Sequence, residues 1–144
     1  MNLFGMLEVS GSALLAERQR AEVVTSNMAN LETTRTAQGG PYRRQLVVFR
    51  AHRVPQFPIL ASDLKPAVAR AVRVDQVLAD RSAPIQRYEP GHPDADENGL
   101  VAYPAINPVE EMTDLLGAVR AYELNASAVQ ASKAMISESL DILR

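Results

Sequence analysis

The sequence contains no cysteine, which excludes disulfide bonds, thiol chemistry and any metal site built from thiolates. It has no run of about twenty apolar residues, so we expect no helix that spans a membrane. The first residues include neither a basic region nor a long apolar stretch, and we therefore expect no cleaved secretory signal. If the protein leaves the cytoplasm, it would do so with its N-terminus in place.

An excess of charge of either sign is also missing. The formal net charge is −2 over 144 residues, whereas proteins that bind nucleic acid usually carry a clear basic excess. Arginines do gather at Arg43, Arg44, Arg50 and Arg53. A solvated strand face or a protein contact explains them at least as well as a phosphate site. The length favours one domain, or one small domain with extensions.

Both ends of the chain show helical periodicity. In residues 1–31 apolar side chains recur at three- and four-residue steps, and most charged residues lie off this stripe. Asparagine tolerates the left-handed conformation that often ends a helix, so we expect the first helix to stop near Asn30. A polar run then leads into Gly39-Gly40-Pro41, a linker or turn. The residues expected to mediate assembly from this helix are Leu3, Leu7, Leu14, Ala21, Val24, Met28 and Leu31.

The region 107–144 has the clearest helix start in the sequence. Asn107 is a good N-cap, Pro108 suits the first helical position, and Glu110 stands where a capping-box carboxylate would. The apolar positions that follow have coiled-coil spacing, interrupted only by Lys133, and begin at Met112. The further residues expected to mediate assembly from this helix are Leu115, Val119, Tyr122, Ala126, Val129, Ile136, Leu140 and Leu143.

This C-terminal stripe of apolar residues needs a partner. Burying a large aliphatic side chain is worth about 1.5–3 kcal/mol, so the whole stripe represents on the order of 15 kcal/mol. Pairing of the two terminal helices as an antiparallel hairpin would cover much of it. Val109, Leu116 and Leu124 widen the stripe beyond a two-helix contact, which favours further cover from neighbouring subunits. A protein whose helices pair only internally is the alternative.

Strand and turn signals lie between the helices. We expect strands at Leu46–Phe49, Val72–Leu78, Ile85–Tyr88 and Leu100–Tyr103, and a proline-punctuated surface loop at Val54–Pro66. Asn98-Gly99 suits a tight turn. The predicted fold class is α+β, with long N- and C-terminal helices that pair as an antiparallel coiled coil around an inserted, small, mostly antiparallel β domain. The predicted domains are the N-terminal helix, 1–31; the linker and β domain, 32–106; and the C-terminal helix, 107–144.

Patterns of catalytic chemistry are missing from the sequence. It has no Gly-x-Ser-x-Gly, Walker or His-Glu-x-x-His motif, and His52 and His92 are ordinary candidates for solvent-exposed histidines. We expect no enzyme, no cofactor and no metal. Residues 94–99 match the first half of an EF-hand calcium loop, but Ala102 and Ala105 stand where further ligands belong. An acidic hairpin loop is the favoured interpretation, and a calcium-binding module is the alternative.

Several segments resemble one known family. Residues 88–101, Tyr-Glu-Pro-Gly-His-Pro-Asp-Ala-Asp-Glu-Asn-Gly-Leu-Val, resemble a signature loop of proximal rod proteins in the flagellar rod and hook axial family. Residues 104–112 resemble the same proteins. The Ser-Asn-Met-Ala-Asn stretch at 26–30 is similar to an element of the wider family, and residues 42–45, followed by Val48-Phe49, fit as well. Residues 53–71 show no family pattern, and Ala71 to Val74 stand where a glycine is usual.

The resemblance implies a structural subunit without catalytic residues. Such subunits are exported by the flagellar type III apparatus without cleavage and assemble in the periplasm with copies of themselves, other proximal and distal rod proteins and the export-gate/ring adaptor. Their terminal helices line a tube that transmits torque, encloses the export channel and is required for motility. The family elements expected to pack in assembly are Ser26, Asn27, Ala29, Asn30, Asn107, Glu110, Glu111 and Met112. The family loop contributes Pro90, Gly91, His92, Pro93, Asp94, Asp96 and Gly99.

Overall fold

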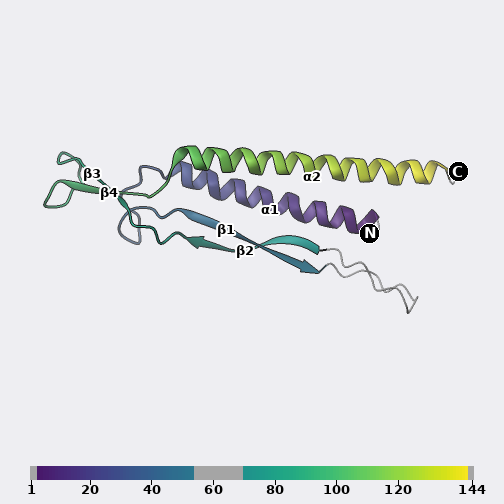
Figure 1. The fold of residues 1–144 in the computed structure, drawn as a ribbon, viewed down its shortest axis with the longest axis horizontal. Coiled ribbons are helices and arrows are strands. Elements are labelled where there is room, and N and C mark those ends of the chain that lie inside the picture. The colour runs from purple at the N-terminus through teal and green to yellow at the C-terminus, as the bar shows by residue number, and fades with distance from the viewer. Residues whose placement is uncertain (1–2, 54–69, 143–144) are drawn as a thin grey trace. The chain divides into compact units, whose positions relative to one another are not determined.

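The fold is known from a computed structural model, which describes residues 3–53 and 70–142. Along the chain, one long helix precedes four strands and a second long helix follows them, which confirms the predicted α+β class (Figure 1). The predicted loop at 54–66 and the predicted assembly residue Leu143 lie outside the described residues, as does the side chain of Leu3. The elements are α1 (Leu3–Ala29), β1 (Gln45–Arg53), β2 (Arg70–Ala79), β3 (Ile85–Tyr88), β4 (Leu100–Tyr103) and α2 (Pro108–Ile142).

The chain divides into two compact units, and each of them takes part of both helices and of both β1 and β2. The first unit holds the described residues among 1–19, 49–75 and 118–144, and the second holds residues 20–48 and 76–117. In the second unit the helices run antiparallel, because Asn27 contacts Glu111 while Arg20, two turns earlier in α1, contacts Asp114, one turn later in α2.

The four described strands form two sheets of two strands each, β1 with β2 and β3 with β4. β3 and β4 are antiparallel, with Ile85 opposite Tyr103 and Tyr88 opposite Leu100. These two strands have the bounds that the sequence predicts. In the loop between them, Gly99 has a φ of +74°, and a Cβ placed there would lie 3.0 Å from Cε2 of Tyr88. The turn therefore requires glycine at this position.

The start of α2 also agrees with the prediction. Pro108 is its first residue, and Oδ1 of Asn107 accepts a hydrogen bond from the N–H of Val109 at 3.0 Å. This bond satisfies one of the backbone donors that a helix start leaves unpaired. Glu110 does not close a regular capping box; its carboxylate accepts a bond from the side-chain amide of Asn107 at 3.3 Å. The two side chains thus brace each other beside the first turn.

The end of α1 lies where it is predicted, but the predicted mechanism is wrong. The helix ends at Ala29, and none of the described residues other than glycine has a positive φ, so Asn30 forms no left-handed cap. Instead, Nδ2 of Asn30 donates to the carbonyl of Ser26 at 2.8 Å, and its Oδ1 accepts from the hydroxyl of Thr33 at 3.1 Å. The carbonyl of Ser26 also accepts the backbone N–H of Asn30 at 3.2 Å, so the asparagine side chain adds a second bond to it, and no left-handed residue is needed.

The covered face of α2 is built from small and polar residues. Glu111, Ala118 and Ser132 are buried, and Asn125 lies at the remaining position of the same seven-residue spacing. Leu115, Val129 and Ile136 are half-buried. Each lies one helical turn, four positions, after a residue of that series (111, 125 or 132). Buried apolar side chains are few among the described residues, so residues 3–53 and 70–142 enclose only a small core. The buried apolar residues are Ala16, Val24, Ala71, Val101, Tyr103, Ile106 and Ala118.

Candidate assembly site

Asn27, near the end of α1, is only 1% exposed. Its Nδ2 donates to the carbonyl of Gln45 at 2.9 Å and to Oε2 of Glu111 at 3.0 Å. Its Oδ1 accepts from the N–H of Gln45 at 2.9 Å and from the hydroxyl of Tyr42 at 3.1 Å. An asparagine amide offers two donors and two acceptor positions, and all four are used. The paired bonds to the Gln45 backbone fasten the start of β1 to α1.

Glu111, in the first turn of α2, is fully buried. Its Oε1 accepts from Nε of Arg44, and its Oε2 accepts from Asn27. Arg44 also lies 3.6 Å from Asp114, which Arg20 of α1 contacts at 3.1 Å. A buried carboxylate is costly unless it is paired and hydrogen-bonded, and here both oxygens have partners. We call Asn27, Tyr42, Arg44, Gln45 and Glu111 the polar junction.

The polar junction unites three segments that are far apart in the sequence: 26–30, 42–45 and 107–112. Asn27 and Glu111 are predicted from the sequence to pack in assembly, and the structure shows their side chains hydrogen-bonded to each other within the chain. Their visible role is to hold the geometry of the chain. Sequence reasoning missed Arg44 as their partner, because an arginine beside a strand is usually solvated. The apolar periodicity of α2 gives no signal for this pairing, because the predicted seam runs through Met112 and leaves Glu111 off it.

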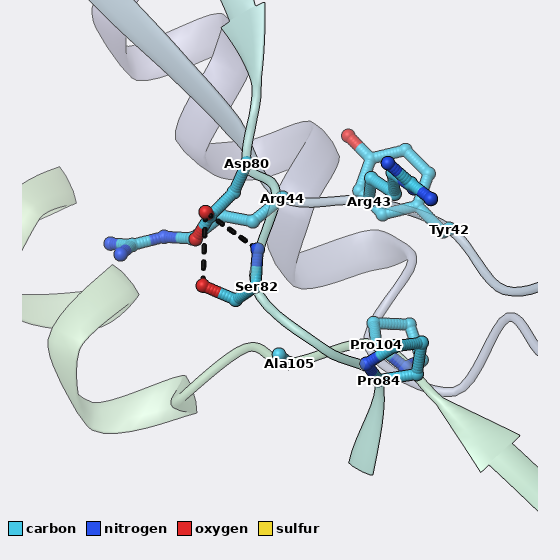
Figure 2. Close-up of a pocket in the computed structure, with 8 residues that line it drawn as sticks. All are labelled: Tyr42, Arg43, Arg44, Asp80, Ser82, Pro84, Pro104 and Ala105. Carbon is cyan, nitrogen blue, oxygen red and sulfur yellow. Dashed lines mark hydrogen bonds between the residues drawn. The ribbon is translucent and has the colours of Figure 1, made fainter.

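A small cavity lies beside the polar junction (Figure 2). Its volume is about 10 Å³, which suits a single water molecule. On its wall, Oδ1 of Asp80 accepts hydrogen bonds from the backbone N–H of Ser82 at 3.0 Å and from its hydroxyl at 2.9 Å. These bonds lower the pKa of Asp80 below its usual 3.8. The N–H of Asp80 donates to the carbonyl of Arg44 at 2.7 Å, which ties the end of β2 to the junction.

The acidic side chains of the family loop have partners within the protein. Oδ1 of Asp96 accepts from two backbone N–H groups of the turn, both at 2.8 Å. Oδ2 of Asp94 accepts from the hydroxyl of Thr34 at 2.8 Å, and its Oδ1 lies 3.7 Å from Arg35. In the part of the chain that the structure describes, no three acidic or histidine side chains are grouped to hold a metal ion. The contacts of Asp94 with Thr34 and Arg35 fasten the loop to the segment that follows α1.

Tyr103 of β4 organises the base of the same loop. The Tyr103 hydroxyl donates to Oε2 of Glu89 at 2.8 Å. The His92 ring packs edge-on against the Tyr103 ring, with 6.3 Å between the ring centroids. The guanidinium carbon of Arg87 lies 4.6 Å from the centroid of the Tyr103 ring. The bond to Glu89, and then burial, raise the pKa of Tyr103 above its usual 10.0. His92 Nδ1 accepts from the N–H of Asp94 at 3.1 Å, so the family's histidine also shapes the loop.

The predicted assembly residues differ in exposure. On α1, Val24 is buried, and Leu7, Leu14, Ala21, Met28 and Leu31 are half-buried. On α2, Leu115, Ala126, Val129 and Ile136 are half-buried, and Met112, Val119, Tyr122 and Leu140 are exposed. Of the other family residues, Ser26, Asn30, His92, Asp94 and Gly99 are half-buried, whereas Ala29, Pro90, Gly91, Pro93, Asp96, Asn107 and Glu110 are exposed.

α2 exposes large apolar side chains along most of its length. Residues 109, 112, 116 and 119 follow heptad spacing and share one face, with Val109 70% and Leu116 57% exposed. Residues 124, 135 and 142 lie on another face, with Leu124 71% and Ile142 80% exposed. We call these the first and second apolar stripes of α2. The described helices include none that is long and apolar enough to cross a membrane.

Comparison with known proteins places this geometry in a class. Residues 7–35 match the family model for the flagella basal body rod protein, and residues 97–142 match the model for the C-terminal part of the flagellar basal body rod FlgEFG proteins. The chain is thus a structural rod protein of the flagellar basal body and not an enzyme.

Curated relatives narrow the class to one family. The flagellar basal-body rod protein FlgC of Borreliella burgdorferi is 40% identical over 152 residues, covering 100% of this chain and 99% of the relative. FlgC of Bacillus subtilis is 38% identical over 148 residues, covering 99% of each chain, and FlgC of Salmonella typhimurium is 33% identical over 143 residues, covering 99% of this chain and 98% of the relative. The chain belongs to the FlgC family of flagellar basal-body rod proteins, which confirms the resemblance noted in its sequence.

Proposed function

We propose that this protein is a subunit of the proximal rod in the periplasmic part of the flagellum. Its terminal helices join it to copies of itself, to other proximal and distal rod proteins and to the export-gate/ring adaptor. The resulting tube encloses the export channel and transmits torque, so the protein is required for motility. It reaches its place through the flagellar type III apparatus without a cleaved signal. The observation that carries the proposal is the exposed apolar surface of α2.

That surface is large compared with what one chain can cover. The side of α2 that faces the rest of the chain carries Glu111, Ala118 and Ser132, whereas Leu116, Leu124 and Ile142 are more than half exposed. Covering each large apolar side chain is worth about 1.5–3 kcal/mol. The helix therefore places most of its hydrophobic free energy on surfaces that other chains can reach. Because the two apolar stripes lie on different faces, the arrangement favours more than one neighbour.

The polar junction supports the same role. A subunit that transmits torque needs helices that do not slip against the rest of the chain. Asn27 and Glu111 hold α1, α2 and the start of β1 at one register, because a shift of any of the three would leave buried polar groups unpaired. Apolar contacts alone tolerate such shifts more easily.

A substitution in the second apolar stripe tests the proposal. Leu124→Glu places a charge at a side chain that is 71% exposed, so the isolated chain should fold normally, with an unchanged circular dichroism spectrum. In a flagellated strain that lacks its own copy of the protein, we expect this variant to yield no complete rods by electron microscopy and no swimming. Gln130→Glu, at an exposed polar position of the same helix, should support both. Normal rods and normal swimming with Leu124→Glu would refute the proposed use of α2.

A further inference from the structure

A groove of about 390 Å³ lies within the first unit, between α1 and the two strands β1 and β2. Leu15, which is 63% exposed, contributes apolar surface from α1, and Val72 and Val74 contribute it from β2. The hydroxyl of Ser12 accepts a bond from the N–H of Val72 at 3.1 Å and donates to the carbonyl of Val9 at 2.7 Å. This hydroxyl fixes the strand against the helix, so the groove is a formed feature of the unit.

The polar lining of the groove includes two cations. Arg18 of α1 and Arg73 of β2 both line it, and the side chain of Arg73 is 60% exposed and lies 4.0 Å from Asp75. His52 of β1 also lines it, and its buried Nδ1 has no hydrogen-bond partner among the described residues. A groove of this composition fits an occupant that combines apolar side chains with carboxylates.

One described segment of this chain has that composition. On the last turns of α2, Met135, Glu138 and Ile142 lie three and four positions apart and so share a face, and Asp141 lies beside them. Met135 is 46% and Ile142 is 80% exposed, and both carboxylates are exposed. The face is therefore apolar, anionic and uncovered within its own chain. We call it the acidic end of α2.

We propose that the acidic end of α2 of one copy docks in the groove of a second copy. Ile142 lies against Leu15 and the two valines of β2, and the carboxylates of Glu138 and Asp141 lie near the exposed guanidinium of Arg73. The proposal rests on the proposed function, since it names one of the contacts by which copies of the subunit join.

The contact has a geometric consequence. The groove and the acidic end of α2 are different surfaces, and each copy has both. The interface between two copies is therefore heterologous. A heterologous contact either closes into a ring or continues as an open helical series. Such a contact can repeat along an assembly, whereas an isologous contact would stop at a pair.

Disulfide trapping tests the pairing directly, because the sequence has no cysteine that would interfere. A full-length Leu15→Cys chain is mixed with an isotope-labelled Ile142→Cys chain under mild oxidation, and mass spectrometry quantifies the mixed dimer. Both positions are largely exposed, so both variants should fold. Leu124→Cys, which is 71% exposed on the same helix, replaces Ile142→Cys as the matched control. We expect a several-fold higher yield for the Leu15–Ile142 pair, and equal yields would overturn the proposal.

Charge reversal tests the electrostatic part. Arg73→Glu in the Leu15→Cys chain should lower the yield several-fold, and Asp141→Arg in the Ile142→Cys chain should restore it. An Arg73→Glu chain that traps as well as the original, or a reversed pair that fails to recover, would overturn the proposed orientation. Raising the salt concentration should weaken trapping of the original pair, because both charges lie near the surface.

The outcomes separate this contact from the proposed function. If Leu124→Glu blocks rod formation while Leu15 and Ile142 fail to cross-link, the rod role stands and this interface is wrong. If the cross-link forms but cells with Leu124→Glu build normal rods, copies of the chain associate through Ile142 as described here, and the proposed role of Leu124 in rod assembly fails.

Discussion

Replacing Glu111 by glutamine probes the polar junction with almost no change in size. Nε of Arg44 and Nδ2 of Asn27 each donate to one oxygen of Glu111. A glutamine has one oxygen and one NH₂ group, so in either orientation its NH₂ faces another donor. The substitution loses one charge-assisted hydrogen bond, about 1.5–3 kcal/mol, and leaves a buried donor unpaired, about 1–3 kcal/mol.

The surroundings of Arg44 decide how much stability the Glu111→Gln substitution removes. Removing one partner of a buried ion pair typically costs about 3–5 kcal/mol. The Arg44 side chain is 21% exposed and keeps Asp114 at 3.6 Å, so part of its charge remains compensated. We therefore expect Glu111→Gln to lower the free energy of unfolding by about 3 kcal/mol.

Urea unfolding of the full chain, followed by far-ultraviolet circular dichroism, measures this change. With a slope of about 1–3 kcal/mol per molar urea, the midpoint should fall by at least about 1 M. Glu110→Gln is the matched control, because Glu110 is the exposed neighbour of Glu111 and its carboxylate accepts a single hydrogen bond, at 3.3 Å, from Asn107 in the described part of the chain. If the two variants unfold at the same urea concentration, the argument for a buried, fully paired Glu111 is refuted.

Three further changes test other parts of the fold. Gly99→Ala should cost about 1–2 kcal/mol, because alanine avoids the positive φ and its Cβ would crowd the Tyr88 ring, and urea unfolding measures the loss. Asn107→Ala should cost about 1 kcal/mol through loss of the N-cap, visible as a lower melting temperature, whereas serine at this position should retain most of the stability. The raised pKa of Tyr103 means that its bond to Glu89 stabilises the fold below pH 10.0, with that contribution lost as the pH rises through the raised value. Ultraviolet titration should lose a tyrosine component with a raised pKa in Tyr103→Phe, and an unchanged titration curve above pH 10.0 would contradict the bond.

Sequence signals predicted correctly those features that depend on interactions between residues close together in the chain. The N-cap at Asn107, proline at the next position and the short strands β3 and β4 each depend on near neighbours. α2 begins where it is predicted, and β3 and β4 begin and end where they are predicted. The positive φ of Gly99 belongs to the same group. At Asn30 the helix end was predicted correctly, but two local solutions compete there, and the side-chain bond to Ser26 is the one that forms.

Which face of α2 is covered is decided by residues that are distant in the sequence. The heptad pattern favours Met112 and Val119 for the seam because they are apolar, yet both are exposed, and Glu111 and Ala118 at the preceding positions are buried. Glu111 can be buried only because Asn27 and Arg44, far away in the chain, satisfy its carboxylate. No periodicity in the sequence contains that information.

The sequence alone determined that two long helices would flank a small β region, where α2 begins, which glycine turns the hairpin and to which family the chain belongs. These features follow from propensities, caps and motifs that operate within a few residues. Only the tertiary structure decided that the helix pair is joined through a buried polar junction, leaving the apolar stripes of α2 uncovered. The physical reason is that a buried charge is stable only with its partners in place, and those partners come together only when the chain has folded.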